Sequence, residues 1–361
     1  MVIHIISYII AILYICYIFR LWRAWKKAER FSFQTGLSSQ KELVSIVVAF
    51  RNEEQHLAKL QNALAKQTYK NYELILVNDH STDDFKSKIS QERRIRLLNA
   101  TEEGKKRALL EGVNAAKGDI VLCTDADCLP CPTWIESIVS FFGTNQTDMV
   151  IAPVVMIPEK KAFERIQTLE FASLQAATAG SACAGDPIMC NGANMAFKKK
   201  EWLELYNGIN EREISGDDVF ILHQFKKSGK NIEYLKSQSA LVFTRPCATA
   251  KVFFSQRARW ASKAKSYTDR SSIFASCCVL GICIALLVNA FGAFFSVAHL
   301  FTFGVIFISK LLIDRIFLWS YCTFSRETYL TIWIFPASLL YPFYITISAI
   351  GGLLGFYQWK K

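Results

Sequence analysis

The sequence predicts an α/β domain with a mostly parallel sheet, combined with helices that cross a membrane. Short apolar runs alternate with amphipathic helical patterns between residues 43 and 155, which is typical of strands connected by helices. Three other segments, at residues 2–19, 271–309 and 328–359, lack Asp, Glu, Lys and Arg altogether. Each is long enough for a helix to approach the thickness of a bilayer. Apolar residues make up 52% of the chain and glycine only 17 of 361 residues, which excludes a disordered or collagen-like protein.

The first apolar segment, residues 2–19, contains His4 as its one possible charge. Five Lys and Arg residues follow between residues 20 and 30, against one acid, Glu29. Bases after an apolar run, without an Ala-x-Ala site near its end, favour an uncleaved anchor over a secretory signal. We therefore expect residues 1–22 to be an N-terminal transmembrane anchor. By the positive-inside rule, the chain from residue 31 onwards should lie in the cytoplasm.

The α/β pattern begins with residues 43–50 (LVSIVVAF), a β-branched run typical of a strand covered on both faces. Further strands are predicted at residues 72–77, 94–98, 119–123 and 149–155, and helices at residues 54–67, 105–116 and 132–142. Such alternation predicts a ligand beyond the carboxyl ends of the strands. The sequence has neither a GxGxxG turn nor a GxxxxGK[ST] loop, so carboxylates and a metal ion would have to hold any nucleotide.

The C-terminal region predicts three further membrane spans. As a helix, residues 271–309 would measure about 58 Å, too long for one crossing, so we expect a hairpin that turns near residues 289–296. A last span is expected within residues 330–357, where Pro336 and Pro342 allow a kink or a re-entrant segment.

Lys310 and Asp314 lie one helical turn apart near the predicted cytoplasmic end of the third span. A self-neutralising pair is the simpler interpretation, and a functional intramembrane pair is the alternative.

The net charge of +11 is concentrated beside the apolar segments. Residues 245–270 contain seven Lys and Arg residues against Asp269 alone. This placement favours anionic lipid head groups over nucleic acid as the partner of the basic residues.

The cysteines of a cytoplasmic domain should remain reduced. Cys128-x-x-Cys131, with Cys123 nearby, resembles half of a zinc site, but no second pair follows, so buried thiols are the better interpretation.

Three acidic clusters fall at predicted strand ends or at a helix start: residues 78–83 (NDHSTD), 124–127 (TDAD) and 215–218 (SGDD). Two carboxylates in Asp-x-Asp spacing can place one group on a nucleoside and the other on Mg²⁺ or Mn²⁺, which both prefer oxygen ligands. For any single cluster, turn or helix-cap chemistry is an equal alternative.

The motifs taken together resemble those of the inverting, nucleotide-sugar-dependent glycosyltransferases of family 2. They are VAFRNEE at 48–54, VNDHSTD at 77–83, GKKRALLEG at 104–112, DAD at 125–127, NGANMAF at 191–197, GDD at 216–218 and QRARW at 256–260. The resemblance covers about residues 43–267, in the family's order. It implies a GT-A fold, a Rossmann-like nucleotide-diphospho-sugar transferase domain, in the cytoplasm, plus α-helical transmembrane segments. Two departures are Ala49, where many members have proline, and Gly216-Asp217, where others have Thr-Glu.

The resemblance also implies roles for single residues. Glu53, Asp79 and Asp125 would contact the nucleoside. Lys105 would offset phosphate charge, and Asp127 would bind the divalent cation, Mg²⁺ or Mn²⁺.

Asp218 would be the catalytic base that takes the proton from the acceptor hydroxyl, with Asp217 as the alternative base.

Gln256, Arg259 and Trp260 match the QxxRW pattern of membrane-integrated members. By resemblance Trp260 would line the acceptor position and Arg259 would help to hold the diphosphate. An ordinary interfacial helix would carry such residues too, and Phe253 and Phe254 are expected to anchor it in the head-group layer.

From these features we expect a cytoplasmic glycosyltransferase domain at 40–245, an amphipathic interfacial helix at 246–270 and a C-terminal transmembrane region at 271–361. The expected function is a membrane-bound inverting transfer from a nucleotide-diphosphate sugar, first of all a UDP-sugar, to an acceptor hydroxyl on a lipid or glycan. The expected location is the plasma (bacterial inner) membrane, with membrane lipids as partners and no nucleic acid. The alternatives are a processive polysaccharide synthase and a non-catalytic nucleotide-sugar-binding membrane scaffold.

Overall fold

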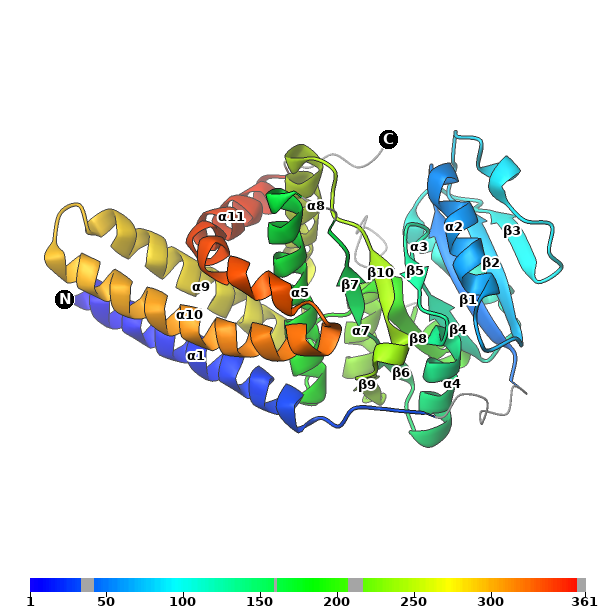
Figure 1. Ribbon diagram of the computed structural model, residues 1–361, viewed down its shortest axis with the longest axis horizontal. Helices are drawn as coiled ribbons and strands as arrows, with labels where there is room; N and C mark the ends of the chain where they lie inside the picture. The colour runs from blue at the N-terminus through cyan, green and yellow to red at the C-terminus, as the bar shows by residue number, and fades with distance from the viewer. Residues whose placement is uncertain (34–41, 159–160, 207–216, 356–361) are drawn as a thin grey trace. The chain divides into compact units, whose positions relative to one another are not determined.

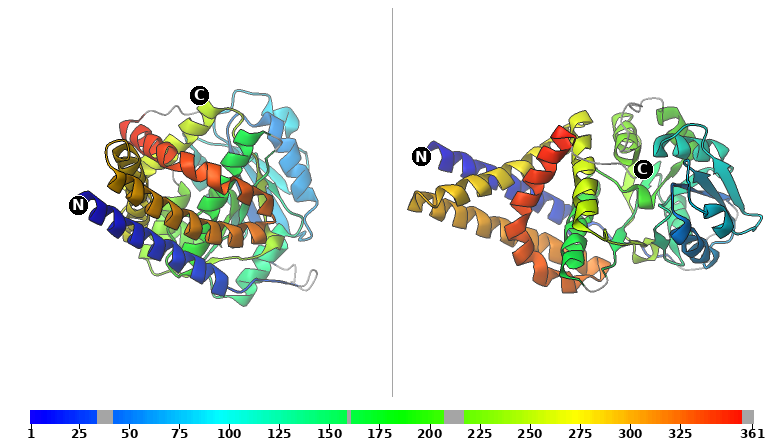
Figure 2. Two further views of the ribbon diagram at one scale, coloured as in Figure 1. Left: turned by 60° about the vertical axis from the view of Figure 1, so that its left-hand side comes forward. Right: turned by 90° about the horizontal axis from the view of Figure 1, so that it is seen from above.

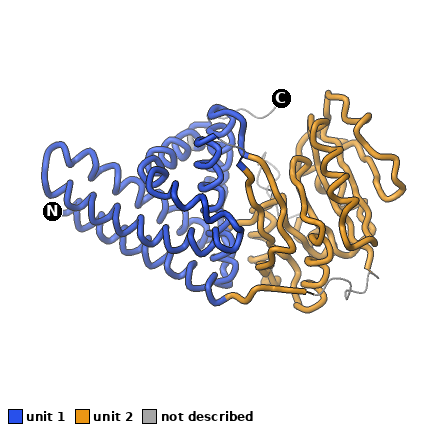
Figure 3. Tube along the Cα trace, viewed as in Figure 1, with its two compact units in different colours: residues 1–27, 158–188, 246–361 blue, residues 28–157, 189–245 orange. Residues whose placement is uncertain are grey.

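The computed structural model describes residues 1–33, 42–158, 161–206 and 217–355. The chain divides into two units, which are described separately (Figure 3). The helical unit comprises residues 1–27, 158–188 and 246–361, and the α/β unit comprises residues 28–157 and 189–245.

The main sheet of the α/β unit has the strand order β3-β2-β1-β4-β8-β6-β9 among the described residues (Figure 1). The strands β1, β2, β3 and β4 are parallel to one another, β8 is antiparallel to both β4 and β6, and β9 is parallel to β6. Their bounds are β1 Val44–Phe50, β2 Tyr72–Asn78, β3 Ile95–Asn99, β4 Ile120–Cys123, β6 Met149–Ile151, β8 Met195–Lys198 and β9 Ile232–Tyr234. The sheet is therefore mixed, with a parallel half formed by the N-terminal strands.

Helices of the α/β unit connect these strands. Their bounds are α2 Glu54–Ala65, α3 Lys105–Ala115, α4 Trp134–Thr144, α6 Lys199–Tyr206 and α7 Asp217–Lys227, with 3₁₀ turns η1 Phe85–Lys88, η2 Gly192–Asn194 and η3 Gln238–Ala240. Helix α3 packs on β1 and β2. Gly112 makes the close approach possible, because a Cβ there would lie 2.4 Å from Cγ1 of Val47. The central strands are buried over nearly their whole length, as the apolar runs predicted.

The prediction of one strand over residues 149–155 is wrong. Strand β6 belongs to the main sheet, whereas β7 (Val154–Met156) pairs with β10 (Val242–Thr244) and, through β10, with β5 (Leu129–Pro130) in a small second sheet. Pro153 lies between β6 and β7 and has no N–H to continue a ladder, so the chain changes sheet at this point.

The helical unit contains the apolar helices. Among the described residues, four helices are long and apolar enough to cross a membrane: Val2–Lys27, Arg270–Gly292, Val297–Ser325 and Thr328–Gly352. The bounds of its elements are α1 Val2–Lys27, α5 Ala162–Cys183, α8 Ala250–Ser262, η4 Lys263–Ser266, α9 Arg270–Gly292, α10 Val297–Ser325, η5 Thr328–Trp333 and α11 Ile334–Leu354. Helices α1, α9 and α10 run side by side (Figure 2). The expected hairpin turn lies at residues 293–296, Pro336 falls in the first turn of α11, and Pro342 lies inside that helix.

The expected pair of Lys310 and Asp314 is present on α10. Lys310 is buried, and the hydroxyl of Tyr14 on α1 donates a 2.7 Å hydrogen bond to Oδ1 of Asp314. The two charges thus neutralise each other and also join α10 to α1, which favours the structural interpretation of the pair.

The division of the chain differs from the contiguous one that the sequence suggested. Helix α5, which follows β7, belongs with the apolar helices and not with the α/β unit. It packs on α1, where Gly180 allows close contact, since a Cβ there would lie 2.9 Å from Cβ of Leu21.

Candidate functional site

The candidate site lies at the carboxyl ends of the parallel strands of the α/β unit. In the register of β1 and β2, Phe50 is opposite Asn78, so the two strands end side by side. The N–H of Asp79 then donates a 2.8 Å hydrogen bond to the carbonyl oxygen of Phe50. Asp125 and Asp127 follow β4, which pairs with β1 on its other side. Parallel pairing therefore brings the first two acidic clusters to one edge of the sheet.

The backbone is unusual at this edge. Asn52 and His80, just after β1 and β2, have φ values of 54° and 56°. The N–H of Asn52 donates to Oγ of Ser81 at 2.9 Å, and its side-chain oxygen accepts from the N–H of Thr82 at 2.8 Å. Residues other than glycine adopt a positive φ only where the surrounding structure stabilises it, and such residues are concentrated at functional sites.

Asp79 connects this edge to the start of α3. The carboxylate is buried, and its Oδ1 accepts a 2.8 Å hydrogen bond from the N–H of Gly104. Gly104 has φ +129°, which side-chain-bearing residues rarely adopt. The next residue, Lys105, extends to Asp125, with 2.6 Å between Nζ and Oδ1. Asp79, Lys105 and Asp125 are thus linked across β2, α3 and β4.

The residues after β4 offer a donor set for a metal ion. The carboxylate oxygens of Asp125 and Asp127 and the sulfur of Cys128 lie within 4.8 Å of one another. Burial, with the charges of Asp127 and Asp125, raises the pKa of the Cys128 thiol well above its ordinary value. The thiol therefore stays protonated, and it donates a hydrogen bond to Oδ1 of Asp127 at 3.6 Å. Two carboxylates without a thiolate fit a hard cation such as Mg²⁺ or Mn²⁺.

The side chain of Asp127 is exposed, but protein atoms surround its carboxyl group and reduce the hydration of that group. This desolvation raises the pKa of its carboxyl, and the negative charges of Asp125 and Glu53 act in the same direction. A cation bound beside Asp127 would relieve this repulsion.

Two residues at the same edge were not singled out from the sequence. His56, in the first turn of α2, lies with Nδ1 2.7 Å from Oε2 of Glu53, which it holds near Asp127. Its spacing of three residues from Glu53 on a helix was the signal that could have identified it. Arg51 forms an ion pair with Glu103, and so ties the end of β1 to the loop before α3.

The third acidic cluster reaches this edge through β8. Cys123 at the end of β4 is opposite Met195 at the start of β8, so η2 and Gly192 lie beside the Asp-x-Asp residues. Oδ2 of Asp218 accepts a hydrogen bond from the N–H of Gly192 at 3.2 Å. Asp217 is the first residue of α7, but its side chain, like residues 215 and 216, lies outside the described part of the chain.

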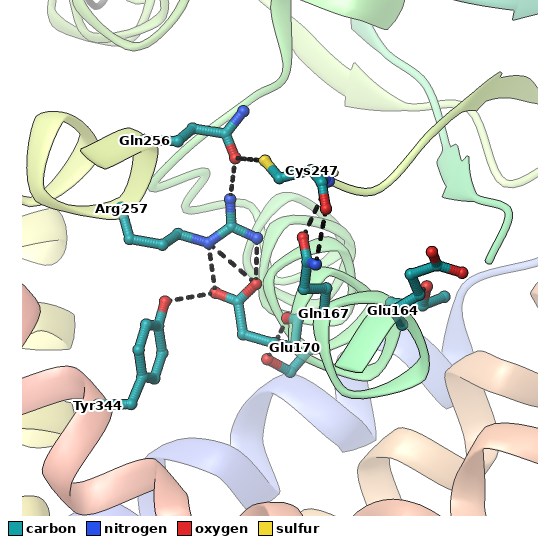
Figure 4. Close-up of polar contacts among 9 residues, drawn as sticks. Glu164, Gln167, Glu170, Cys247, Gln256, Arg257 and Tyr344 are labelled. Carbon is teal, nitrogen blue, oxygen red and sulfur yellow. Dashed lines mark hydrogen bonds and ion pairs between the residues drawn. The ribbon is translucent and has the colours of Figure 1, made fainter. Parts of the chain in front are cut away.

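Gln256, Arg259 and Trp260 lie on α8 of the helical unit, at helical spacing. Oε1 of Gln256 accepts a hydrogen bond from Arg257 (Figure 4). The guanidinium of Arg257 also lies 4.2 Å from the centroid of the Trp260 ring. Arg257 pairs with Glu170 on α5, and neither residue was singled out from the sequence.

The expectation for Phe253 is wrong, because this residue is buried against Phe163 and Tyr344 and does not point to a head-group layer. Phe254 is 41% exposed. The expectation of buried thiols holds for Cys123 and Cys128, whereas Cys131 is partly buried. None of the cysteines in the described residues forms a disulfide.

The fold of the α/β unit is of the GT-A type. Residues 45–206 match the family described as glycosyl transferase family 2. The chain therefore carries a family 2 glycosyltransferase domain.

Curated relatives and a solved structure agree with this assignment. Glycosyltransferase GlyG of Streptococcus pneumoniae is 32% identical over 115 residues, which cover 30% of this chain and 38% of that protein. The poly-beta-1,6-N-acetyl-D-glucosamine synthase of Staphylococcus aureus is 26% identical over 227 residues, which cover 60% of this chain and 53% of that protein. The alignments thus span between about a third and a half of the relatives' lengths. The mannosyltransferase PcManGT of Pyrobaculum calidifontis has a similar fold, with a TM-score of 0.62, 17% identity and coverage of 98% and 99% of the two chains.

Proposed function

We propose that this protein is a membrane-integrated, metal-dependent, inverting glycosyltransferase that transfers a sugar from a nucleotide diphosphate to a hydroxyl group of a lipid at the cytoplasmic leaflet. The observation that carries the proposal is the convergence of Asp79, Asp125, Asp127 and Asp218 on one edge of the sheet. Desolvation, with the charges of Asp125 and Glu53, raises the pKa of Asp127, so bringing these carboxyl groups together does not favour their charged forms and supports a functional role.

In the proposed site, Glu53, Asp79 and Asp125 bind the nucleoside and Lys105 faces the diphosphate. Asp127, together with Asp125, would hold Mg²⁺ or Mn²⁺, which when bound supplies positive charge to the leaving diphosphate. Lys105 would leave Asp125 for the phosphates. The archaeal protein of similar fold is described in complex with GDP-Man and Mn²⁺. That description supports testing GDP-sugars beside UDP-sugars as donors.

Asp218 acts as the general base. It takes the proton of the acceptor hydroxyl while the hydroxyl oxygen forms a bond to the anomeric carbon. The bond from that carbon to the diphosphate oxygen breaks in the same displacement, which inverts the anomeric configuration. Hydrogen bonds from the N–H groups of Gly192 and Val219 hold the two carboxylate oxygens in place. Asp217 is the alternative base.

A lipid acceptor is supported by the four candidate spans and by the bases beside them. Gln256 and Trp260 are proposed to contact the acceptor, and Arg259 the diphosphate. The bases in the last turns of α1 and α8 support a cytoplasmic position of the α/β unit, and the plasma (bacterial inner) membrane is the proposed location.

The test uses purified protein in nanodiscs with labelled UDP- and GDP-sugars, Mg²⁺ or Mn²⁺, and a bacterial total lipid extract. We expect label in the lipid fraction, with inverted configuration at the anomeric carbon. Asp218→Asn should lower the transfer rate about 10²- to 10⁴-fold while nucleotide affinity stays within about twofold. Asp217→Asn is the matched control, and if it alone abolishes transfer, the base is Asp217. Unchanged turnover of both variants would refute the assigned base.

A processive polysaccharide synthase is the second candidate. It is favoured by the similarity to the staphylococcal poly-beta-1,6-N-acetyl-D-glucosamine synthase over 227 residues. Product length separates the two functions, since only long polymer would contradict the lipid acceptor. Nucleotide-sugar binding without any transfer would support the non-catalytic scaffold instead.

A further inference from the structure

Polar contacts around Arg257 join three helices of the helical unit (Figure 4). Arg257 lies on α8, and its side chain is only 3% exposed. Its Nε donates to both carboxylate oxygens of Glu170 on α5, at 3.2 and 3.1 Å, and its Nη2 donates to the same carboxylate. The hydroxyl of Tyr344 on α11 donates to Oε1 of Glu170 at 2.9 Å. One buried ion pair therefore connects α5, α8 and α11.

The rest of the Arg257 guanidinium reaches two residues of the QxxRW pattern. Its Nη1 donates to Oε1 of Gln256, and its carbon lies 4.2 Å from the centroid of the Trp260 ring. The ring of Phe253 lies on it as well, at 4.6 Å. The thiol of Cys247 donates a second hydrogen bond to Oε1 of Gln256 at 3.4 Å. The amide oxygen of Gln256 thus has two donors, and its NH₂ group is the end that remains to donate to a ligand.

Stability alone does not explain a buried ion pair at this place. Burial lowers the pKa of Arg257, but the Glu170 charge outweighs this effect, so the pKa is raised and the guanidinium stays charged. The cost of removing two charges from water can exceed the energy of their attraction, and apolar residues of similar size often serve stability equally well. The planar guanidinium group of an arginine holds its N–H donors in fixed directions, so it orients the groups that it bonds to, which an apolar contact does not do.

Helix α11 also fixes the position of α8 along its length. A Cβ at Gly352 would lie 2.8 Å from the backbone N of Ser262 and 2.9 Å from the carbonyl oxygen of Ala258. The two helices therefore approach closely near Gly352, while Tyr344 bonds to the ion pair two turns earlier on α11. Most of α11 belongs to a candidate membrane span.

We propose that Arg257, held by Glu170 and Tyr344, is the positioning residue that orients Gln256 and Trp260 for the acceptor. Arg257 itself does not contact the substrate. The inference rests on the proposed function, because the acceptor role of Gln256 and Trp260 comes from the QxxRW resemblance.

Two variants test the inference. Tyr344→Phe removes one hydroxyl and keeps the ring, and Arg257→Lys keeps the charge and loses the fork. In the nanodisc assay we measure the half-saturating fraction of bacterial total lipid extract, the KM for the nucleotide sugar, and donor hydrolysis without lipid. Tyr329→Phe is the matched control, because Tyr329 is 51% exposed in the same unit.

We expect Tyr344→Phe to raise the half-saturating lipid fraction about fivefold, and Arg257→Lys to raise it more than about tenfold. The donor KM and donor hydrolysis should stay within about twofold, which a general loss of folding would not allow. If Arg257→Lys does not fold, Tyr344→Phe decides alone. An unchanged lipid dependence, or an equal rise of both KM values, overturns the inference while wild-type transfer leaves the proposed function intact. Absence of transfer by the wild-type protein overturns both.

Discussion

Replacing Lys105 with methionine should change two binding constants in opposite directions. In the structure Lys105 neutralises Asp125, with 2.6 Å between Nζ and Oδ1, and both belong to the edge that would hold a cation and a diphosphate. Without nucleotide, the ammonium group competes with a metal ion for the carboxylates. With nucleotide, the same group should attract the phosphates. Lys105→Met should therefore bind Mn²⁺ more tightly and nucleotide diphosphate more weakly.

The magnitude follows from the exposure of the pair. Two unit charges about 4 Å apart interact by about 4 kcal/mol at an effective dielectric constant near 20. The side chains of Lys105 and Asp125 are 38% and 35% exposed, so solvent and salt screen the interaction strongly. About 1 kcal/mol remains, which corresponds to a factor of about five in Mn²⁺ affinity. The loss of nucleotide affinity should reach about tenfold, because an ion pair with a phosphate is stronger than an exposed surface pair.

The assay is a titration of purified protein with Mn²⁺ followed by electron paramagnetic resonance of the free ion, at fixed ionic strength, and then a nucleotide titration at saturating Mn²⁺. Lys59→Met is the control, because Lys59 is an exposed lysine on α2. Weaker or unchanged Mn²⁺ binding by Lys105→Met would refute the competition between the lysine and the metal ion.

Three further changes test the packing. Asn194→Leu should lower the free energy of unfolding by about 4 kcal/mol in denaturant titrations, because it removes three buried 2.8 Å hydrogen bonds. Gly118→Ala should lower the melting temperature by several degrees, because its Cβ would lie 2.3 Å from the carbonyl oxygen of Leu43. Glu327 lies between two spans, and burial raises its pKa to about 7 from 4.5, so the folded protein holds the proton more tightly than the unfolded chain. This stabilisation, about 3 kcal/mol, is complete below pH 4.5 and is lost as the pH rises through 7. Glu327→Gln should therefore lack this part of the dependence of the melting temperature on pH.

The central strands β1, β2 and β4 were predictable because they are buried over nearly their whole length. Continuous β-branched runs such as residues 44–50 identify such strands without knowledge of their partners. The Asp-x-Asp residues could likewise be placed, since a polar residue directly after such a strand must lie at the carboxyl edge. Local pattern and tertiary structure agree in these places.

The remaining features depend on contacts between distant residues. Arg257 and Glu170 are 87 positions apart, and no local pattern marks either as a partner of the other. Helix α5 carries three charges in its first half, Glu164, Arg165 and Glu170, and its charge-free remainder, residues 171–183, is too short to cross a bilayer. Its place among the apolar helices could therefore not be read from the sequence. The strand predicted at 149–155 was divided by Pro153, whose effect depends on a second sheet that residues 129–130 and 242–244 provide.

The central claim is that the acidic residues at the sheet edge form one metal-dependent nucleotide site. Calorimetric titration of UDP and GDP into the purified protein, with and without Mn²⁺, tests it most directly when wild type is compared with Asp127→Asn. The account predicts that Mn²⁺ tightens the binding of at least one nucleotide about tenfold or more in the wild type and has no such effect in Asp127→Asn. Equal affinity with and without Mn²⁺, or the same Mn²⁺ effect in both proteins, would contradict it.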